Sequence, residues 1–167
     1  TILLARKGAP VPAIGDVDID EAKIIMEKIE GKPLIEILRS NEHDEELLIK
    51  VGRSIRELHR NAVNHGDLST NNILISDNRD AFLIDLGLAT REYDLEGFGI
   101  DLHVLHEILR ASHPDVKGAM DLVLKGYSQL DEELGKPEAA PGGFPPDAED
   151  VIKRLGQIMK RVRYHGG

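Results

Sequence analysis

Two short apolar runs near the middle of the chain, separated by a polar turn, constrain the fold more than any other feature. The runs are residues 73–75 (ILI) and 81–84 (AFLI), and the segment between them, SDNRD, is rich in residues that favour tight turns. This pattern predicts a β-hairpin. Because the strands of a hairpin are antiparallel, the residue that enters the first strand and the residue that leaves the second lie at the same end.

Three side chains that carry oxygen stand at that end of the predicted hairpin. Asp67 and Asn72 lie in the loop before the first strand, and Asp85 follows the second. Carboxylate and amide oxygens suit Mg²⁺, which needs few protein ligands because it keeps several waters. Phosphoryl transfer from ATP also needs a group that orients the nucleophile. We therefore expect Asn72 and Asp85 to bind Mg²⁺ and with it ATP. Asp67 is expected to be catalytic, by accepting the proton of the attacking hydroxyl or by positioning water.

Helical periodicity dominates on both sides of this hairpin. A long helix is predicted over residues 44–62, where apolar residues three and four apart form one stripe: Leu47, Val51, Ile55, Leu58 and Ala62. Further helices are expected over residues 96–111 and from Pro114 to about residue 134. A loop rich in Gly and Pro, residues 135–146, separates these from a final helix, which carries Val151, Leu155, Ile158 and Val162 at regular spacing.

The first part of the chain is less regular. Residues 1–7 are expected to end a helix, which the following segment GAPVP stops. Two apolar runs, residues 13–17 and 22–29, flank an acidic stretch and predict a second hairpin. Pro33 suits the first turn of a short helix through Arg39. Together with the long helices, these elements predict an α+β fold.

Composition excludes several classes of protein. No apolar run approaches the roughly 18 residues of a membrane span, so no membrane association is expected. The chain has no cysteine, which excludes disulfides and thiolate metal sites and favours a cytoplasmic location. A net charge of −9 argues against a broad nucleic-acid-binding surface, although Lys153, Arg154 and the segment KRVR at residues 160–163 make the last helix basic.

The spacing of the polar residues resembles that of the protein-kinase superfamily. Residues 65–72 read HGDLSTNN and residues 85–87 read DLG, similar to the H-x-D-x-x-x-x-N and D-x-G motifs of kinases. Of the two adjacent amides, the resemblance selects Asn72 over Asn71 as the metal ligand. It implies a protein-kinase-like fold, seen mostly as its helical lobe.

The resemblance implies roles for four further residues. The segment MEKIEG, residues 26–31, stands where kinases place the hinge between their lobes. Glu27 and Ile29 are therefore expected to bind adenine through their backbone. His65 is expected to orient the catalytic loop, and Asp101 to accept hydrogen bonds from the backbone of that loop.

The resemblance also implies a division of the chain, with departures from the kinase pattern. Residues 1–30 are expected to be a remnant of the N-lobe, with the end of helix C, two strands and the hinge. Residues 31–167 then form the C-lobe with the catalytic loop and the basic C-terminal helix. No Gly-rich loop or Lys-bearing strand precedes the hinge, so we expect a truncated N-lobe. Gly66 replaces the usual Arg before the catalytic Asp, and no peptide-docking segment separates Gly87 from Asp101.

Two families of small atypical kinases carry Gly or Ala before the catalytic Asp and Ser or Thr after the following Leu, as this chain does at Gly66 and Ser69. They are the RIO kinases and the small kinase of the KEOPS complex (the p53-related protein kinase family). The second is the better match, through GAPVP, IEGKPL, HGDLSTNN, IDLHVL and the basic end. It implies an atypical serine/threonine kinase and ATPase that uses Mg²⁺ and ATP to support threonylcarbamoyl modification of tRNA adenosine. The large lobe is expected to bind the threonylcarbamoyl transferase subunit and the small lobe another KEOPS subunit. For the basic C-terminal helix, tRNA is a candidate ligand.

Two alternatives stay open. Small-molecule phosphotransferases of the aminoglycoside-kinase type also use HGD with an Asn at the same offset, but they carry His-Pro where this chain has Ser69 and Thr70. The other alternative is a kinase-shaped scaffold that binds nucleotide without catalysis. ATP turnover that depends on Asp85 would reject the scaffold, whereas turnover that requires a sugar or amine acceptor would favour the phosphotransferase.

Overall fold

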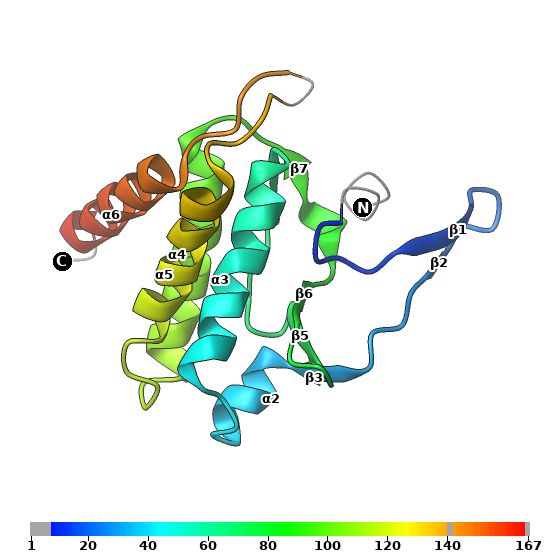
Figure 1. Ribbon diagram of the computed structural model, residues 1–167, viewed down its shortest axis with the longest axis horizontal. Coiled ribbons are helices and arrows are strands. Elements are labelled where there is room, and N and C mark those ends of the chain that lie inside the picture. The colour runs from blue at the N-terminus through cyan, green and yellow to red at the C-terminus, as the bar shows by residue number, and fades with distance from the viewer. Residues whose placement is uncertain (1–7, 140–141, 166–167) are drawn as a thin grey trace.

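Small sheets lie along one side of a group of long helices (Figure 1). The computed structural model describes residues 8–139 and 142–165, with side chains up to residue 162. The helix expected to end within residues 1–7 lies outside this part of the chain. The mixed α+β character predicted from the sequence is confirmed.

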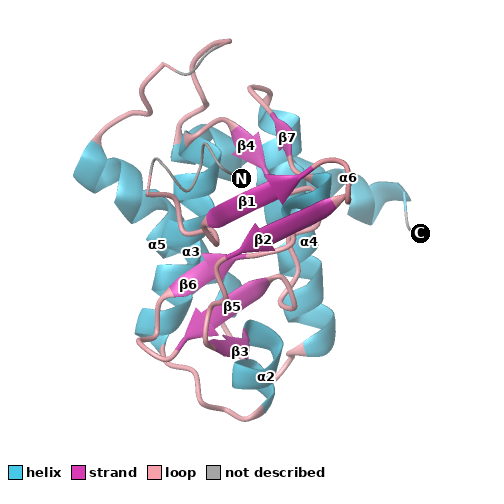
Figure 2. Ribbon diagram, turned by 90° about the vertical axis from the view of Figure 1, so that its right-hand side faces the viewer, coloured by secondary structure: helices cyan, strands magenta, loops and turns pink. Residues whose placement is uncertain are grey.

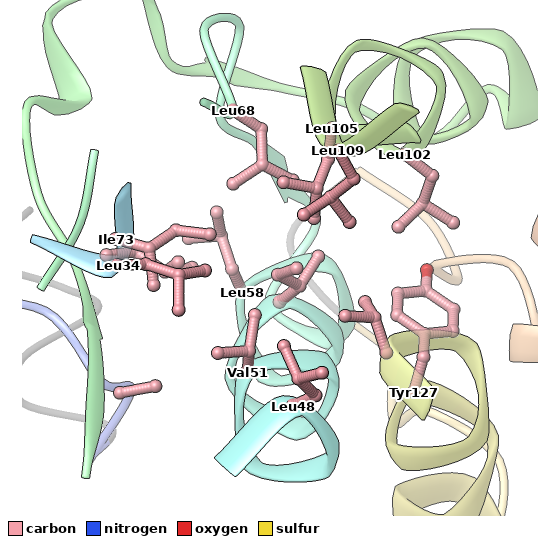
Figure 3. Close-up of a cluster of buried hydrophobic side chains, with 14 of the residues drawn as sticks. Leu34, Leu48, Val51, Leu58, Leu68, Ile73, Leu102, Leu105, Leu109 and Tyr127 are labelled. Carbon is pink, nitrogen blue, oxygen red and sulfur yellow. The ribbon is translucent and has the colours of Figure 1, made fainter. Parts of the chain in front are cut away.

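The long helices form where the apolar stripes predict them. They are α3 (Glu45–Arg60), α4 (Leu95–Ser112) and α6 (Ala148–His165). Asp44 and Asp94 cap the first two, each accepting a hydrogen bond from a backbone amide of the first turn. The predicted stripe of α3 is completely buried. It packs between the sheet residue Ile73 on one side and the side chains of α4 and of Tyr127 on the other (Figure 3).

Helix α5 (Ala119–Leu134) begins later than the predicted start at Pro114. Gly118 has a φ of 74°, a left-handed conformation that an α-helix does not contain, so the helix starts only after it. Residues 114–118 form turns instead. Val162 of α6 is 52% exposed although its spacing continues the apolar stripe, because that end of α6 projects away from the other helices (Figure 1).

Helices α3 and α5 lie against each other through a pair of glycines. A Cβ atom at Gly52 would overlap the carbonyl oxygen of Val123, and a Cβ at Gly126 would overlap that of Ile49. Each glycine therefore lets the backbone of one helix touch that of the other. This close approach places Tyr127, one residue after the second glycine, deep in the core.

The strands form three small antiparallel sheets among the described residues (Figure 2). The predicted first hairpin is β1 (Ile14–Asp18) with β2 (Lys23–Met26), and most of its residues are exposed. The predicted central hairpin is β5 (Ile73–Ser76) with β6 (Ala81–Leu83), whose alternate residues are buried.

Two strand pairings were not predicted. Strand β3 (Gly31–Pro33) pairs with β5, where the sequence predicts only a break before the short helix α2 (Leu34–Arg39). A Cβ at Gly31 would overlap the Ile75 carbonyl oxygen, and Pro33 is tolerated because β3 is an edge strand. The second pair is β4 (Val63–Asn64) with β7 (Thr90–Arg91). None of the helices in the described part of the chain is long and apolar enough to cross a membrane.

An ion pair between α3 and α5 should make the free energy of unfolding depend on pH. Arg56, which is fully buried, donates two hydrogen bonds of 2.8 Å to the carboxylate of Asp131, and Arg60 donates a third of 2.6 Å. Partial burial opposes ionisation of Asp131, but these bonds and one from the Ala148 amide outweigh it and hold its pKa below the ordinary value. A carboxylate whose pKa is lowered by folding stabilises the folded state fully at pH values above its unfolded-state pKa of about 3.9. This stabilisation is lost as the pH falls through the folded-state pKa.

We therefore expect Asp131→Asn to lower the free energy of unfolding by about 2 kcal/mol near neutral pH, because a charge-assisted hydrogen bond loses its charge. The difference between variant and wild type should begin to shrink below about pH 4, where the carboxylate of the unfolded wild type takes up a proton, and it should disappear only below the lowered pKa of folded Asp131. Urea denaturation across the pH range measures both effects. Glu133→Gln is the matched control, since the Arg53–Glu133 pair joins the same two helices but is exposed. An Asp131→Asn effect as small as this control's would contradict the prediction.

Candidate active site

The loop predicted to be catalytic runs between β4 and β5 and is held in a tight turn. The Ser69 amide donates to the Asp67 carbonyl at 2.9 Å, and the Asn72 amide donates to the Ser69 carbonyl at 3.0 Å. Asn72 Nδ2 donates to the carbonyl of Asp67 at 2.9 Å and to its Oδ2 at 3.0 Å. Two of the three predicted side chains are therefore in direct contact. Because Asn72 uses its nitrogen for Asp67, its Oδ1 is the atom that can serve a cation.

Asp85, the third predicted side chain, leaves strand β6 in an unusual conformation. Its φ and ψ are both 58°, in the left-handed region that non-glycine residues seldom adopt. A 3₁₀ turn, η1 (Leu86–Leu88), follows it. The preceding residue, Ile84, is tied to the catalytic loop on both sides: its amide donates to the Asn72 carbonyl at 2.9 Å, and its carbonyl lies 2.9 Å from Nε2 of the buried His65. These two bonds bring Asp85 beside the loop. His65 also accepts the Asp67 amide through Nδ1 at 3.3 Å, and its role in orienting the loop stays a prediction.

A cavity of about 520 Å³ opens next to Asp85. Glu27 and Ile29, the predicted hinge residues, line it from one side, whereas Asp67 and Asn72 are not among its lining residues. The other walls are mostly apolar and come from the first hairpin, from β5 and β6, and from η1: Pro12, Ile14, Ile24, Met26, Leu74, Leu83, Ile84, Leu86 and Gly87. The Glu27 amide already donates to the Ala13 carbonyl at 2.7 Å. Of the backbone groups of Glu27, the carbonyl is therefore the one that could bind an occupant.

Asp101, from helix α4, anchors the start of the catalytic loop. Its buried carboxylate accepts the amide of His65 at 2.5 Å and the amide of Gly66 at 3.0 Å, as the kinase resemblance implies. His59 Nε2 lies 3.2 Å from Oδ2 of the same carboxylate. Burial opposes the charge of Asp101, but these bonds outweigh it, so the pKa of Asp101 lies below its ordinary value. The negative charge that holds the loop is thereby retained.

The glycine before Asp67 has a structural reason. Gly66 has a φ of 81°, and a Cβ at this position would overlap the carbonyl oxygen of Leu88. The turn after Asp85 therefore lies directly on the catalytic loop. An Arg at this position, as in most kinases, would separate the two segments. The sequence shows the substitution but not its cause, because residues 66 and 88 are distant in the chain.

One polar residue of this region, His59, was not predicted from the sequence. It is fully buried and lies on the apolar face of α3, one turn after Ile55. A histidine in register with an apolar stripe was the available signal. The sequence predicted the hydrogen bonds of Asp101 to the loop backbone, but not its contact with His59.

The oxygen ligands fit a magnesium ion that keeps most of its own water. Among the described residues, no group of three or more His, Cys, Asp or Glu side chains could enclose a metal. Asp85 and Asn72 together supply a carboxylate and an amide oxygen. Mg²⁺ is usually bound by one or two such groups, with water and substrate phosphates completing six ligands.

Comparisons with known proteins agree on one family. The RIO domain family matches residues 2–112. The chain is 36% identical over 161 residues to the KEOPS complex subunit Bud32 of Pyrococcus abyssi, covering 94% of this chain and 67% of that protein. It is 32% identical over 159 residues to a probable serine/threonine-protein kinase BUD32 homolog of Archaeoglobus fulgidus, covering 95% of this chain and 70% of that protein.

A third relative is a probable bifunctional tRNA threonylcarbamoyladenosine biosynthesis protein of Methanosarcina acetivorans, 36% identical over 159 residues. The match covers 95% of this chain, which spans only 25% of the length of that relative. The kinase-like fold predicted from the motifs is confirmed by these matches. The chain belongs to the RIO domain family and, within it, to the Bud32 group of atypical kinases.

Proposed function

We propose that this chain is the catalytic part of a Bud32-type ATPase and serine/threonine kinase that binds Mg²⁺ and ATP and supports threonylcarbamoyl modification of tRNA. The observation that carries the proposal is the cluster at one end of the central hairpin. Asp67 and Asn72 are in contact there, and both His65 and Asn72 are bonded to the residue before Asp85. In the same proposal, residues 1–30 belong to the N-lobe of a kinase and residues 31–167 to its C-lobe.

The cavity supports the placement of the nucleotide. Its apolar walls suit a flat ring, and the Glu27 carbonyl and the Ile29 backbone would bind the polar edge of adenine. Asp85, on the rim of the same cavity, would then lie toward the phosphates. In this proposal the base lies in the cavity and the triphosphate lies over the catalytic loop.

Asn72 and Asp85 would hold Mg²⁺, which when bound neutralises charge on the phosphate oxygens. Asp67 is exposed and in contact with Asn72, so it would accept the proton of a serine or threonine hydroxyl, or orient a water for hydrolysis. Asn72 holds the Asp67 carboxylate through Nδ2, which limits its rotation and keeps one oxygen directed at the nucleophile. Asp101 fixes the backbone on which Asp67 stands.

The names of the relatives support a place in a KEOPS complex, since one is a KEOPS subunit and another a tRNA threonylcarbamoyladenosine biosynthesis protein. We propose that the C-lobe binds the threonylcarbamoyl transferase subunit and that the N-lobe remnant binds a further subunit. The basic side chains of α6 make tRNA phosphates a candidate ligand of that helix. A cytoplasmic location stays a prediction.

Thermal unfolding with nucleotide tests the proposal. A saturating ligand stabilises the state that binds it, so Mg²⁺ with ATP at about a hundred times its Kd should raise the free energy of unfolding by about 2.7 kcal/mol. ATP without Mg²⁺ should stabilise less, because two of the proposed contacts to the triphosphate run through the ion. Equal melting curves with and without nucleotide would contradict the proposal.

Turnover measurements separate the alternatives. Release of phosphate, or transfer to protein, in the absence of any small acceptor supports the kinase and ATPase. Stabilisation by nucleotide without turnover would support a scaffold. Turnover that appears only when a sugar or amine acceptor is added would support the small-molecule phosphotransferase.

A further inference from the structure

A row of buried polar side chains leads from the catalytic loop into the interior of the helices. It consists of Asp101, His59, Tyr127, Arg56 and Asp131, which we call the buried polar chain. From Asp101 the first contact is His59 Nε2 at 3.2 Å. His59 Nδ1 then lies 2.8 Å from the hydroxyl of Tyr127, which Arg56 Nη1 approaches at 3.3 Å. Both Tyr127 and His59 are fully buried.

The donors and acceptors of this chain fit together in one direction. Arg56 carries only donors, so the Tyr127 oxygen accepts from it and its O–H is left to donate to His59 Nδ1. With Nδ1 accepting, a neutral His59 carries its proton on Nε2 and donates it to Asp101. Burial lowers the pKa of His59 more than Asp101 raises it, which agrees with a neutral ring.

The groups that face His59 come from every element packed against it. Arg56 belongs to its own helix α3, Asp101 to α4, Tyr127 to α5, and His65 to the catalytic loop. Phe98 of α4 packs on the ring, with centroids 4.7 Å apart. The ring is thus fixed in position by packing and in proton placement by its two hydrogen bonds.

The end of the buried polar chain that lies farthest from the catalytic loop reaches the beginning of helix α6. Arg56 is held by Asp131 through two bonds of 2.8 Å, and its Nη2 also donates to the Pro146 carbonyl at 2.8 Å. Asp131 Oδ2 accepts the amide of Ala148, the first residue of α6, at 2.8 Å. The position of Arg56 is therefore set from the segment that begins the last helix.

We propose that Tyr127 and Arg56 are positioning residues for ATP turnover, acting through His59 and Asp101 to fix the backbone on which Asp67 stands. The inference rests on the proposed function, since it concerns the same catalytic loop. The Tyr127 hydroxyl gives His59 one proton arrangement, and that arrangement supports the Asp101 carboxylate. Asp101 in turn holds the amides of His65 and Gly66, immediately before Asp67.

The test compares Tyr127→Phe with wild type in the full chain, with Glu133→Gln as control. The control removes an exposed pair between the same helices that has no bond to the buried polar chain. We expect Tyr127→Phe to lower kcat about tenfold, the effect of one lost buried hydrogen bond, while KM for ATP stays within about twofold. A kcat within about twofold of wild type in a folded variant, or a rise in KM alone, would overturn the proposal.

NMR of protein labelled uniformly with a nitrogen isotope supplies a readout that a change in stability alone would not produce. In wild type, His59 should show a protonated Nε2 and an unprotonated Nδ1 that accepts a hydrogen bond. In Tyr127→Phe the Nδ1 signal should shift, and so should the backbone amides of His65 and Gly66, while in Glu133→Gln all three keep their wild-type values. A proton on Nδ1 in wild type, or unmoved loop amides in Tyr127→Phe, would reject the inference.

The two readouts separate this inference from the proposed function. If wild type does not turn over ATP, the proposed function is wrong. The NMR signals of the His65 and Gly66 amides then test by themselves whether the buried polar chain positions the loop. Should Tyr127→Phe fail to fold, Asp131→Asn replaces it, because this change loosens Arg56, which orients the Tyr127 hydroxyl, without removing any atom of Tyr127 or His59. It should lower kcat in the same direction with KM unchanged, and unchanged kcat would count against the proposal.

Discussion

Replacing Asp67 or Asp85 by alanine is expected to lower ATP turnover and autophosphorylation by about 10²-fold or more. Losses of this size are typical when a positioned acid–base group or a metal ligand is removed. A factor of 10² corresponds to about 2.7 kcal/mol of lost transition-state stabilisation. Both side chains are exposed, so neither change should disturb the core.

The two variants should differ in binding. Asp67 is not a proposed ligand of Mg²⁺, so Asp67→Ala should still be stabilised by Mg²⁺ with ATP in a thermal unfolding measurement. Asp85→Ala removes a proposed ligand and should lose most of the dependence of nucleotide binding on the ion. The pair of results therefore separates the proton acceptor from the metal ligand.

A third aspartate serves as the control. Asp77 is exposed in the turn at the opposite end of the same hairpin. Asp77→Ala removes an equal charge from the chain and should leave turnover at the wild-type rate. Full activity in both Asp67→Ala and Asp85→Ala would refute the assignment of the site.

Replacing Gly126 by alanine is expected to cost about 3 kcal/mol of folding free energy, at the upper end of the usual range for overpacking. The added methyl would overlap the backbone carbonyl of Ile49, and a backbone atom cannot move aside by changing rotamer. Helices α3 and α5 would have to separate. The change would also strain the contacts that Tyr127 makes from the next position in α5.

The control for this prediction is another glycine inside a helix. A Cβ at Gly156 of α6 would meet no atom within 4 Å. Alanine is favoured over glycine in helices by about 1 kcal/mol, so Gly156→Ala should stabilise the protein slightly. Urea denaturation of both variants measures the difference, and effects of equal sign and size would show that the helices do not meet at Gly126.

The candidate site could be predicted from the sequence because its residues lie close together in the chain. Asp67, Asn72 and Asp85 fall within one loop and one hairpin, and antiparallel pairing brings the ends of a hairpin together. The contact between Asp67 and Asn72 is local as well, because the two residues are five positions apart in one loop. The prediction that Glu27 and Ile29 belong to a hinge required the kinase resemblance, because nothing in their own segment indicates the cavity that they line.

The amino-acid sequence by itself determined the long helices α3, α4 and α6, both hairpins and the spacing of the polar residues, since all of these arise from local periodicity and turn chemistry. Only the tertiary structure decided that β3 pairs with β5 and that Gly66 and Gly126 admit no side chain. It also decided the hydrogen bonds of His59. The physical reason is the same in each case: these features depend on atoms from distant parts of the chain that meet only after folding, and no local pattern encodes such a meeting.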